Sequence, residues 1–164
     1  MSQKINKPVI KCINIQKSYE QGLNESVLKG INLRVESGTS LAITGSSGSG
    51  KTTLLNIIAG LDNPDAGEVH VADQLLAKLN SSKLCKFRNQ NIGFVFQFHS
   101  LLSEFTAAEN IAMPLMIAGN PRKLAIERAC SLMDKIGLNG KANRLPANLS
   151  GGECQRIAVL RAII

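Results

Sequence analysis

The chain has 164 residues, a length that suits a single domain with a sizeable core. Its hydrophobic share of 44% and its charged share of 19% exclude a mainly disordered or fibrous protein. The formal net charge of +7 favours anionic partners, but it leaves nucleic acid, a phospholipid surface and a nucleotide open.

The apolar stretches and the cysteines narrow the class of protein further. The longest apolar stretches, such as Ile111–Ile117, fall far short of the roughly 20 residues that a membrane-spanning helix needs, and no signal-peptide run follows the N-terminus. We therefore expect a cytosolic chain that does not cross a bilayer. The cysteines are widely scattered and show no metal-ligand spacing, so we expect free thiols.

Five short segments rich in Val, Ile and Phe are predicted to be β-strands, because turn residues bound several of them. They are Val9–Ile15, Ile31–Val35, Ser40–Thr44, Glu68–Val71 and Ile92–Phe96. Apolar and polar residues alternate along Ile31–Val35, which indicates a half-buried strand. Ser40–Thr44 is mostly apolar, which is typical of a central buried strand.

Two segments show the apolar spacing of helices. Thr52–Ala59 carries an apolar face and stops at Gly60, and the pattern from Asn120 to Ile136 stops at a glycine as well. A strand-rich first half therefore gives way to a helical section. We expect a mixed α/β core with an inserted helical subdomain at about residues 88–148.

A glycine-rich motif lies directly after the apolar strand and directly before the first helix. It matches G-x-x-x-x-G-K-[ST] at Gly45, Ser46, Ser47, Gly48, Ser49, Gly50, Lys51 and Thr52, with Thr53 next in the chain. The glycines let backbone N–H groups curl around phosphate oxygens, and the helix N-terminus adds a positive dipole end. Lys51 can place its charge on the β and γ phosphates, and Thr52 can offer a hydroxyl to Mg²⁺. The motif predicts a nucleoside triphosphate site.

A second motif indicates which P-loop family is present. Leu149 to Glu153 reads LSGGE and is followed by Gln155 and Arg156, a pattern that resembles the LSGGQ signature of ABC ATPases. Ser150 can cap a helix whose first N–H groups, with the Gly151 and Gly152 backbone, form a second anion site. The resemblance implies a dimer in which this signature, Ser150 to Glu153, covers the ATP that the partner's P-loop holds.

Two further residues match the ABC pattern by their place in the chain. The resemblance implies that Gln97 reaches Mg²⁺ and the attacking water, so that Gln97 and Lys51 are the catalytic residues and Thr52 and Gln97 the metal ligands. It also implies that Tyr19 stacks on the adenine base. The fold it implies is the P-loop NTPase type, with residues 1–87 and 149–164 as the ATP-binding core.

The strings GSSGSGKTTLLNIIAGLD and FQFHSLLSEFTAAENIAMPL resemble most the lipoprotein-releasing (LolD-type) branch of this family. ABC ATPases of macrolide export and of cell division share the first string and remain alternatives. The resemblance implies an ATP- and Mg²⁺-dependent motor subunit at the cytoplasmic face of the bacterial inner membrane. Its partners would be a second ATP-binding subunit, transmembrane permease subunits and, indirectly, a lipoprotein.

Four apolar side chains follow Gln97 at the place where the family receives a coupling helix of the membrane subunit. These are Phe98, Leu101, Leu102 and Phe105. About half of them are expected to serve this interface and the others to fill the core of the helical subdomain.

The remaining expectations concern other classes of ABC protein and the C-terminal end. ABC ATPases that act on nucleic acid carry long coiled-coil insertions, and the stretch from Gln97 to Leu149 has no room for one, so we expect no nucleic-acid partner. The family pattern continues after Ile164 with a Walker B strand, a D-loop and a switch histidine. We therefore expect a cassette that is incomplete at its C-terminus and inactive alone. A non-catalytic remnant stays an alternative.

Overall fold

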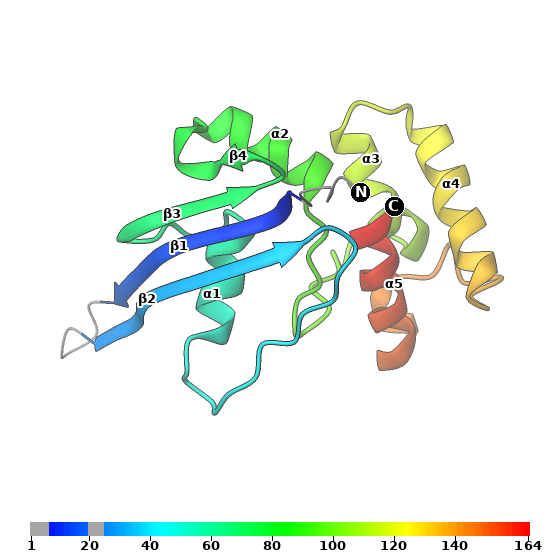
Figure 1. Cartoon of the computed structure of the whole chain (residues 1–164). Coiled ribbons are helices and arrows are strands. Elements are labelled where there is room, and N and C mark those ends of the chain that lie inside the picture. Colours follow the sequence, from blue (N-terminus) through cyan, green and yellow to red (C-terminus); the bar gives the residue numbers. More distant parts are fainter. Residues whose placement is uncertain (1–6, 20–24) are drawn as a thin grey trace, which may run out of the picture. The chain divides into compact units, whose positions relative to one another are not determined.

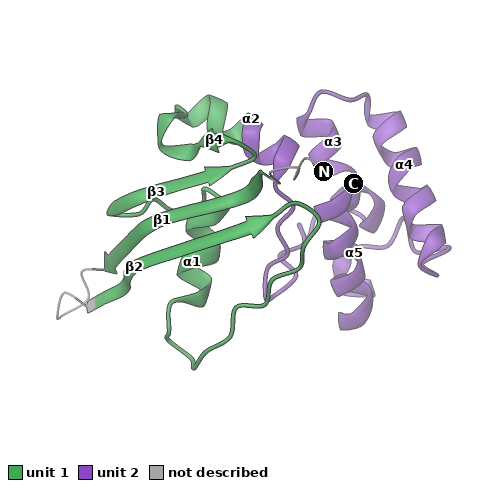
Figure 2. Ribbon diagram, viewed as in Figure 1, with its two compact units in different colours: residues 1–85 green, residues 86–164 purple. Residues whose placement is uncertain are grey.

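The computed structural model describes residues 7–19 and 25–164 (Figure 1). They form two compact units, which divide between Cys85 and Lys86 (Figure 2). No helix among the described residues is both long and apolar enough to cross a membrane. The thiols of Cys12, Cys130 and Cys154 are free, as the sequence predicted.

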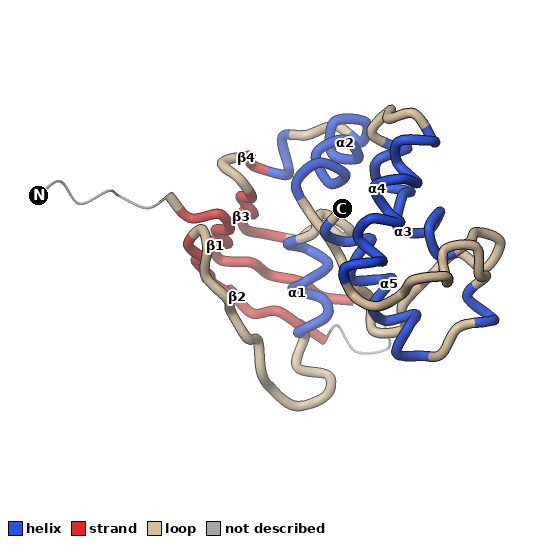
Figure 3. Tube along the Cα trace, turned by 90° about the vertical axis from the view of Figure 1, so that its right-hand side faces the viewer, coloured by secondary structure: helices blue, strands red, loops and turns tan. Residues whose placement is uncertain are grey.

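The first unit is built on a sheet in the order β2-β1-β3-β4, in which all neighbours are antiparallel. Its elements are β1 (Pro8–Tyr19), β2 (Glu25–Glu36), α1 (Lys51–Ile58), β3 (Ala66–Val71), β4 (Gln74–Leu75) and the 3-10 helix η1 (Leu76–Lys78). Helix α1 lies along the sheet and contacts β3 (Figure 3). Its buried residues Leu54, Ile57 and Ile58 have the spacing that places side chains on one helix face.

A bulge in β1 sets which side chains face the core of the first unit. Cys12 and Ile15 are both buried although simple alternation would place them on opposite faces. The register shifts between them, and Asn14 has a left-handed φ of 49°. Gly67 of the neighbouring strand lies so close to the bulge that a Cβ there would be 2.4 Å from the Asn14 carbonyl oxygen. Only glycine fits at this position.

The second unit is helical apart from its loops. Its elements are the end of α2 (Ser81–Asn91), α3 (Ala107–Ile117), α4 (Arg122–Lys135), the 3-10 helix η2 (Pro146–Asn148) and α5 (Gly151–Ile163). Helices α3, α4 and α5 pack around a core that includes Ile111, Met133, Leu138 and Ile157.

One polar residue is completely buried in this helical unit. The Asn110 side chain accepts from the Leu102 N–H at 2.8 Å and donates to the carbonyl oxygens of Leu102, Phe105 and Thr106. These bonds satisfy the amide group, as burial of a polar side chain requires. They also fix the loop that leads into α3.

Most of the predicted elements are confirmed, and two strands are wrong. The strands at residues 9–15, 31–35 and 68–71 lie within β1, β2 and β3, and the two predicted helices correspond to α1 and α4. Ser40–Thr44 and Ile92–Phe96 form no strand in the structure, and Leu41 and Phe96 are 53% and 40% exposed. A strand exists only where a neighbour completes its hydrogen bonds, and no described strand pairs with either segment.

The predicted division of the chain remains a prediction for residues 149–164. The sequence placed them in the ATP-binding core together with residues 1–87. In the structure, the helix of this segment, α5, packs against α3 and α4 in the second unit.

Candidate functional site

The loop at residues 45–50 has a backbone that only glycine adopts readily at its key positions. Gly45, Gly48 and Gly50 have φ angles of 153°, 80° and 85°. A Cβ at Gly50 would lie 2.8 Å from the Leu28 side chain, whereas a Cβ at Gly48 would meet nothing within 4 Å. The fold therefore needs glycine at Gly50 for space and conformation, and at Gly48 for conformation alone.

Lys51 folds back over this loop. Its Nζ donates to the carbonyl oxygens of Gly45 at 2.9 Å and Ser46 at 2.6 Å, and to the Ser49 hydroxyl at 3.3 Å. An ammonium group has three donors, and the three loop acceptors can use all of them. The positive charge of Lys51 is thus held against the loop.

Helix α1 begins at the same point. Its first helical hydrogen bond runs from the Leu54 N–H to the Gly50 carbonyl oxygen at 2.9 Å. The N–H groups of residues 51–53 therefore project from the N-terminus, where the helix dipole favours negative charge. The first turn contains no acidic residue that would compete for them. Thr52 is exposed and Thr53 is half-buried.

Tyr19 ends β1 and is 41% exposed. Its hydroxyl donates to Asp62 Oδ2 at 2.7 Å. This hydrogen bond raises the pKa of Tyr19, and an interaction with the Thr53 side chain acts in the opposite direction. Tyr19 and the start of α1 therefore lie together in the first unit, and the stacking of Tyr19 on adenine stays a prediction.

The LSGGE segment starts α5 with a capping box. Ser150 is the N-cap: its hydroxyl accepts from the Glu153 N–H at 3.3 Å, and Glu153 Oε2 accepts from the Ser150 N–H at 2.8 Å. Glu153 Oε1 also pairs with Lys141 Nζ at 3.1 Å. The Ser150 backbone N–H and Lys141 lower the pKa of Glu153 to about 2, so the carboxylate is ionised at neutral pH.

Gly151 and Gly152 follow in the first turn of α5, and both are exposed. A Cβ at Gly151 would meet nothing within 4 Å in this chain. Packing within the chain therefore gives no reason for glycine at this position. Close approach of another group to the backbone does give one.

Gln97 is exposed and precedes a loop that is hydrogen-bonded to a residue near the end of α5. The Arg161 guanidinium donates to the Ser100 carbonyl oxygen at 2.8 Å and to the His99 carbonyl oxygen at 2.9 Å. His99 and Ser100 both have positive φ angles, 36° and 47°. Phe98 beside them is 82% exposed.

The predicted site residues thus lie in two groups. The first unit brings the glycine-rich loop, Lys51, Thr52, Thr53 and Tyr19 together, and the second unit carries Gln97 and the LSGGE segment. Sequence reasoning missed Asp62, Lys141 and Arg161, whose partners are distant in the chain. The described residues contain no group of three or more His, Cys, Asp or Glu that could hold a metal ion.

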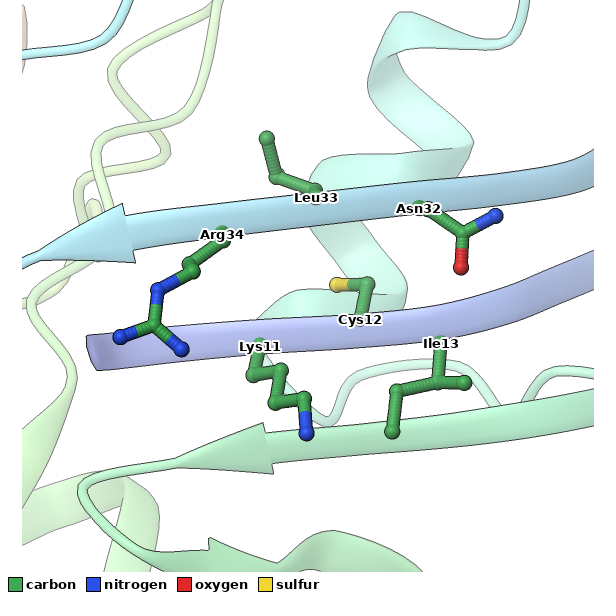
Figure 4. Close-up of a pocket in the computed structure, with 6 residues that line it drawn as sticks. All are labelled: Lys11, Cys12, Ile13, Asn32, Leu33 and Arg34. Atoms are coloured by element: carbon green, nitrogen blue, oxygen red, sulfur yellow. The ribbon is translucent and has the colours of Figure 1, made fainter. Parts of the chain in front are cut away.

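An open pocket of about 410 Å³ lies elsewhere on the first unit (Figure 4). It is lined by Lys11, Cys12, Ile13, Asn32, Leu33 and Arg34. Lys11 and Ile13 point to one side of β1 and Cys12 to the other, as the pleat of a strand requires (Figure 4). Burial raises the pKa of Cys12 to about 11, so its thiol is not a nucleophile at neutral pH. None of the predicted site residues lines this pocket.

Comparison with known proteins identifies the family. Residues 28–164 match the family described as ABC transporter. The chain is 52% identical over 158 residues to the lipoprotein-releasing system ATP-binding protein LolD of Saccharophagus degradans, covering 96% of this chain and 69% of that protein. It is 48% identical to LolD of Chromohalobacter salexigens, covering 97% of this chain and 68% of that protein.

A solved structure agrees with the sequence comparison. The dimeric post-hydrolysis state of the ATP-binding cassette MJ0796, bound to ADP and Pi, superimposes with a TM-score of 0.87 and 38% identity, over 94% of this chain and 68% of that one. The predicted α/β fold of the P-loop NTPase type, with an ABC ATPase core, is confirmed. The chain belongs to the ATP-binding subunits of ABC transporters, in the LolD branch that its sequence resembles.

Proposed function

We propose that this protein is the ATP-hydrolysing motor subunit of an ABC system that releases lipoproteins from the bacterial inner membrane. The observation that carries the proposal is the 52% identity to a LolD protein over 96% of the chain. The second relative carries the same name. No observation on the structure favours the macrolide-export or cell-division branches.

ATP binds at the loop of the first unit. The N–H groups of residues 45–50 and of the first turn of α1 surround the phosphates, and Lys51 moves from the loop carbonyls to the β and γ phosphate oxygens. Its present partners are neutral acceptors, and a phosphate oxygen is the stronger partner because both groups are charged. Tyr19 stacks on the adenine.

The donor chemistry of this chain also fits Mg²⁺. The Thr52 hydroxyl and the Gln97 amide are exposed oxygen donors, the ligand type that Mg²⁺ prefers together with substrate phosphates. Bound Mg²⁺ neutralises charge that develops on the phosphates during transfer to water. Lys51 adds its own charge there, and Gln97 orients the water.

The LSGGE segment acts on the nucleotide of a second subunit. Ser150 and the exposed backbone of Gly151 and Gly152 approach the triphosphate that the partner's loop holds. The absence of any packing reason for glycine at Gly151 supports such an approach. The cassette MJ0796, which this chain resembles, is dimeric.

The loop after Gln97 contacts the transmembrane subunits at the cytoplasmic face of the membrane. Phe98, Leu102 and Phe105 are 82%, 42% and 37% exposed. Leu101 instead packs against the core of the second unit. The exposed side chains offer an apolar surface to an amphipathic helix.

Reconstitution tests the proposal. The protein, extended through the Walker B strand, D-loop and switch histidine of the family pattern, is assembled with its transmembrane subunits in vesicles that contain a lipoprotein. The lipoprotein released after addition of ATP is measured. We expect ATP-dependent release, no release with the Lys51→Ala variant, and normal release with Lys83→Ala, a control at an exposed lysine. ATP turnover without lipoprotein release, or with transport of a macrolide instead, would contradict it.

A further inference from the structure

Four side chains meet where the end of β1 lies beside the loop that follows α1. They belong to Lys17, Tyr19, Asp62 and Asp65. Asp62 is at the centre: Oδ2 accepts from the Tyr19 hydroxyl at 2.7 Å, and Oδ1 accepts from Lys17 Nζ at 3.0 Å. Lys17 Nζ also pairs with Asp65 at 3.5 Å and donates to the Asn63 carbonyl oxygen at 2.7 Å. The side chain of Lys17 is only 12% exposed.

The charges of this cluster are arranged around Tyr19. Lys17 lies between two carboxylates, and its Nζ is 5.2 Å from the centroid of the Tyr19 ring, within the range of a cation–π contact. The ammonium group therefore takes one face of the ring. A base that stacks on Tyr19 must take the other face.

Two hydrogen bonds that involve backbone groups connect the end of β1 with the loop after α1. Asp65 Oδ2 accepts from the Ser18 N–H at 2.7 Å, and the Asp65 N–H donates to the Gln16 carbonyl oxygen at 2.9 Å. The end of β1 is thus joined to the loop that follows α1, the helix whose N-terminus carries the phosphate-binding motif. These contacts hold the end of β1 beside the loop that follows α1.

We propose that Asp62, held by Lys17, is a positioning residue that sets the orientation of the Tyr19 ring for adenine. A tyrosine that is 41% exposed at a strand end can exchange side-chain rotamers more easily when its hydroxyl is not held. The hydrogen bond to an ionised carboxylate supplies that restraint, because charge-assisted bonds are short and strong. The inference rests on the proposed stacking of Tyr19 on adenine.

The test compares ATP with tripolyphosphate, which has the phosphates but no base, as ligands of the full chain. Dissociation constants are measured by calorimetry for the parent and for Tyr19→Ala, Tyr19→Phe and Asp62→Ala. Loss of stacking in Tyr19→Ala should weaken ATP binding about tenfold or more. Tyr19→Phe and Asp62→Ala lose the same hydrogen bond, so each should weaken ATP binding about fivefold. Tripolyphosphate should bind all of them as it binds the parent.

Combined and control variants sharpen the comparison. The double variant Tyr19→Phe with Asp62→Ala should bind ATP no more weakly than Asp62→Ala alone, because Asp62→Ala already removes the hydrogen bond to Tyr19 together with the ion pair to Lys17. Asp73→Ala removes an exposed carboxylate that pairs with Lys7 at 3.4 Å, and it should leave both ligands unaffected. If Asp62→Ala does not fold, Tyr19→Phe and Asp62→Asn carry the test.

Three outcomes separate the hypotheses. If Tyr19→Ala binds ATP as the parent does, the proposed adenine contact itself is wrong. If Tyr19→Ala weakens ATP binding but Tyr19→Phe and Asp62→Ala do not, stacking stands and positioning by Asp62 is overturned. An equal loss for ATP and tripolyphosphate in Asp62→Ala shows that Asp62 maintains the loop and not the ring, which also overturns the proposal.

Discussion

At the scale of single residues, the site depends on charges that the backbone holds in place. Lys51 donates hydrogen bonds to carbonyl oxygens of the phosphate-binding loop. Glu153 accepts a hydrogen bond from the Ser150 N–H at the start of α5. Both side chains are therefore ordered by the fold before any ligand is present. On binding, Lys51 would exchange these neutral loop partners for phosphate oxygens.

The first prediction concerns Lys51. Lys51→Ala removes a unit charge from the phosphate site, and one charge at about 4 Å is worth about 4 kcal/mol at an effective dielectric constant of 20. We expect ATP affinity to fall at least a hundredfold in calorimetry. The circular dichroism spectrum should stay that of the parent, because Lys51 is the first residue of α1 and is not among the buried residues of that helix. Equal ATP affinity in parent and variant would show that the loop does not bind the phosphates.

The second prediction concerns the pH dependence at Glu153. The folded state lowers its pKa from 4.5 to about 2, so the ionised carboxylate contributes stability above pH 4.5, and this contribution is lost as the pH falls through about 2. Glu153→Gln should lower the melting temperature at pH 7, and the difference from the parent should shrink between pH 4.5 and pH 2. Glu127→Gln, at an exposed position of α4, serves as the control. A difference that is constant over this pH range would exclude the assigned role.

At the scale of elements, local patterns predicted α1, α4, β1, β2 and β3, because apolar periodicity and glycine stops act over a few residues. The strands at Ser40–Thr44 and Ile92–Phe96 failed because pairing depends on segments far away in the chain. The contacts of Asp62 were invisible for the same reason: Tyr19 is 43 positions away and Lys17 is 45. The motifs were found because their chemistry resides in consecutive residues.

The third prediction concerns how α5 supports the loop after Gln97. Arg161→Ala removes two hydrogen bonds to the carbonyl oxygens of His99 and Ser100 and should free the loop that presents Phe98. We expect at least a fivefold loss of co-purification with the transmembrane subunits, similar to the loss with Phe98→Ser, and little change in ATP affinity. Arg128→Ala in α4 should leave both measurements unchanged. Normal co-purification of the Arg161 variant would mean that this loop does not serve the interface.

At the scale of the whole molecule, the two groups of site residues belong to different units of the chain. The first unit holds the phosphate loop with Tyr19, and the second holds the LSGGE segment with Gln97. A Cβ at Gly151 would meet nothing within 4 Å, and the cassette MJ0796, which this chain resembles, is dimeric. The proposal that a second copy completes the site combines these two observations.

The last prediction tests that completion. Gly151→Asp should be tolerated by the fold, because a Cβ there meets nothing within 4 Å and the residue lies in the first turn of α5, where acidic side chains are favourable. The new carboxylate would face the triphosphate of the partner and repel it. With a non-hydrolysable ATP analogue in ultracentrifugation, the parent should form dimers and the variant should stay monomeric. The calorimetric affinity of the monomeric variant for the analogue should equal that of the parent.

Ser131→Asp, at an exposed position of α4, adds the same charge away from the interface and should dimerise normally. Dimers of the Gly151→Asp variant would show that the signature of this chain does not meet the nucleotide of a partner.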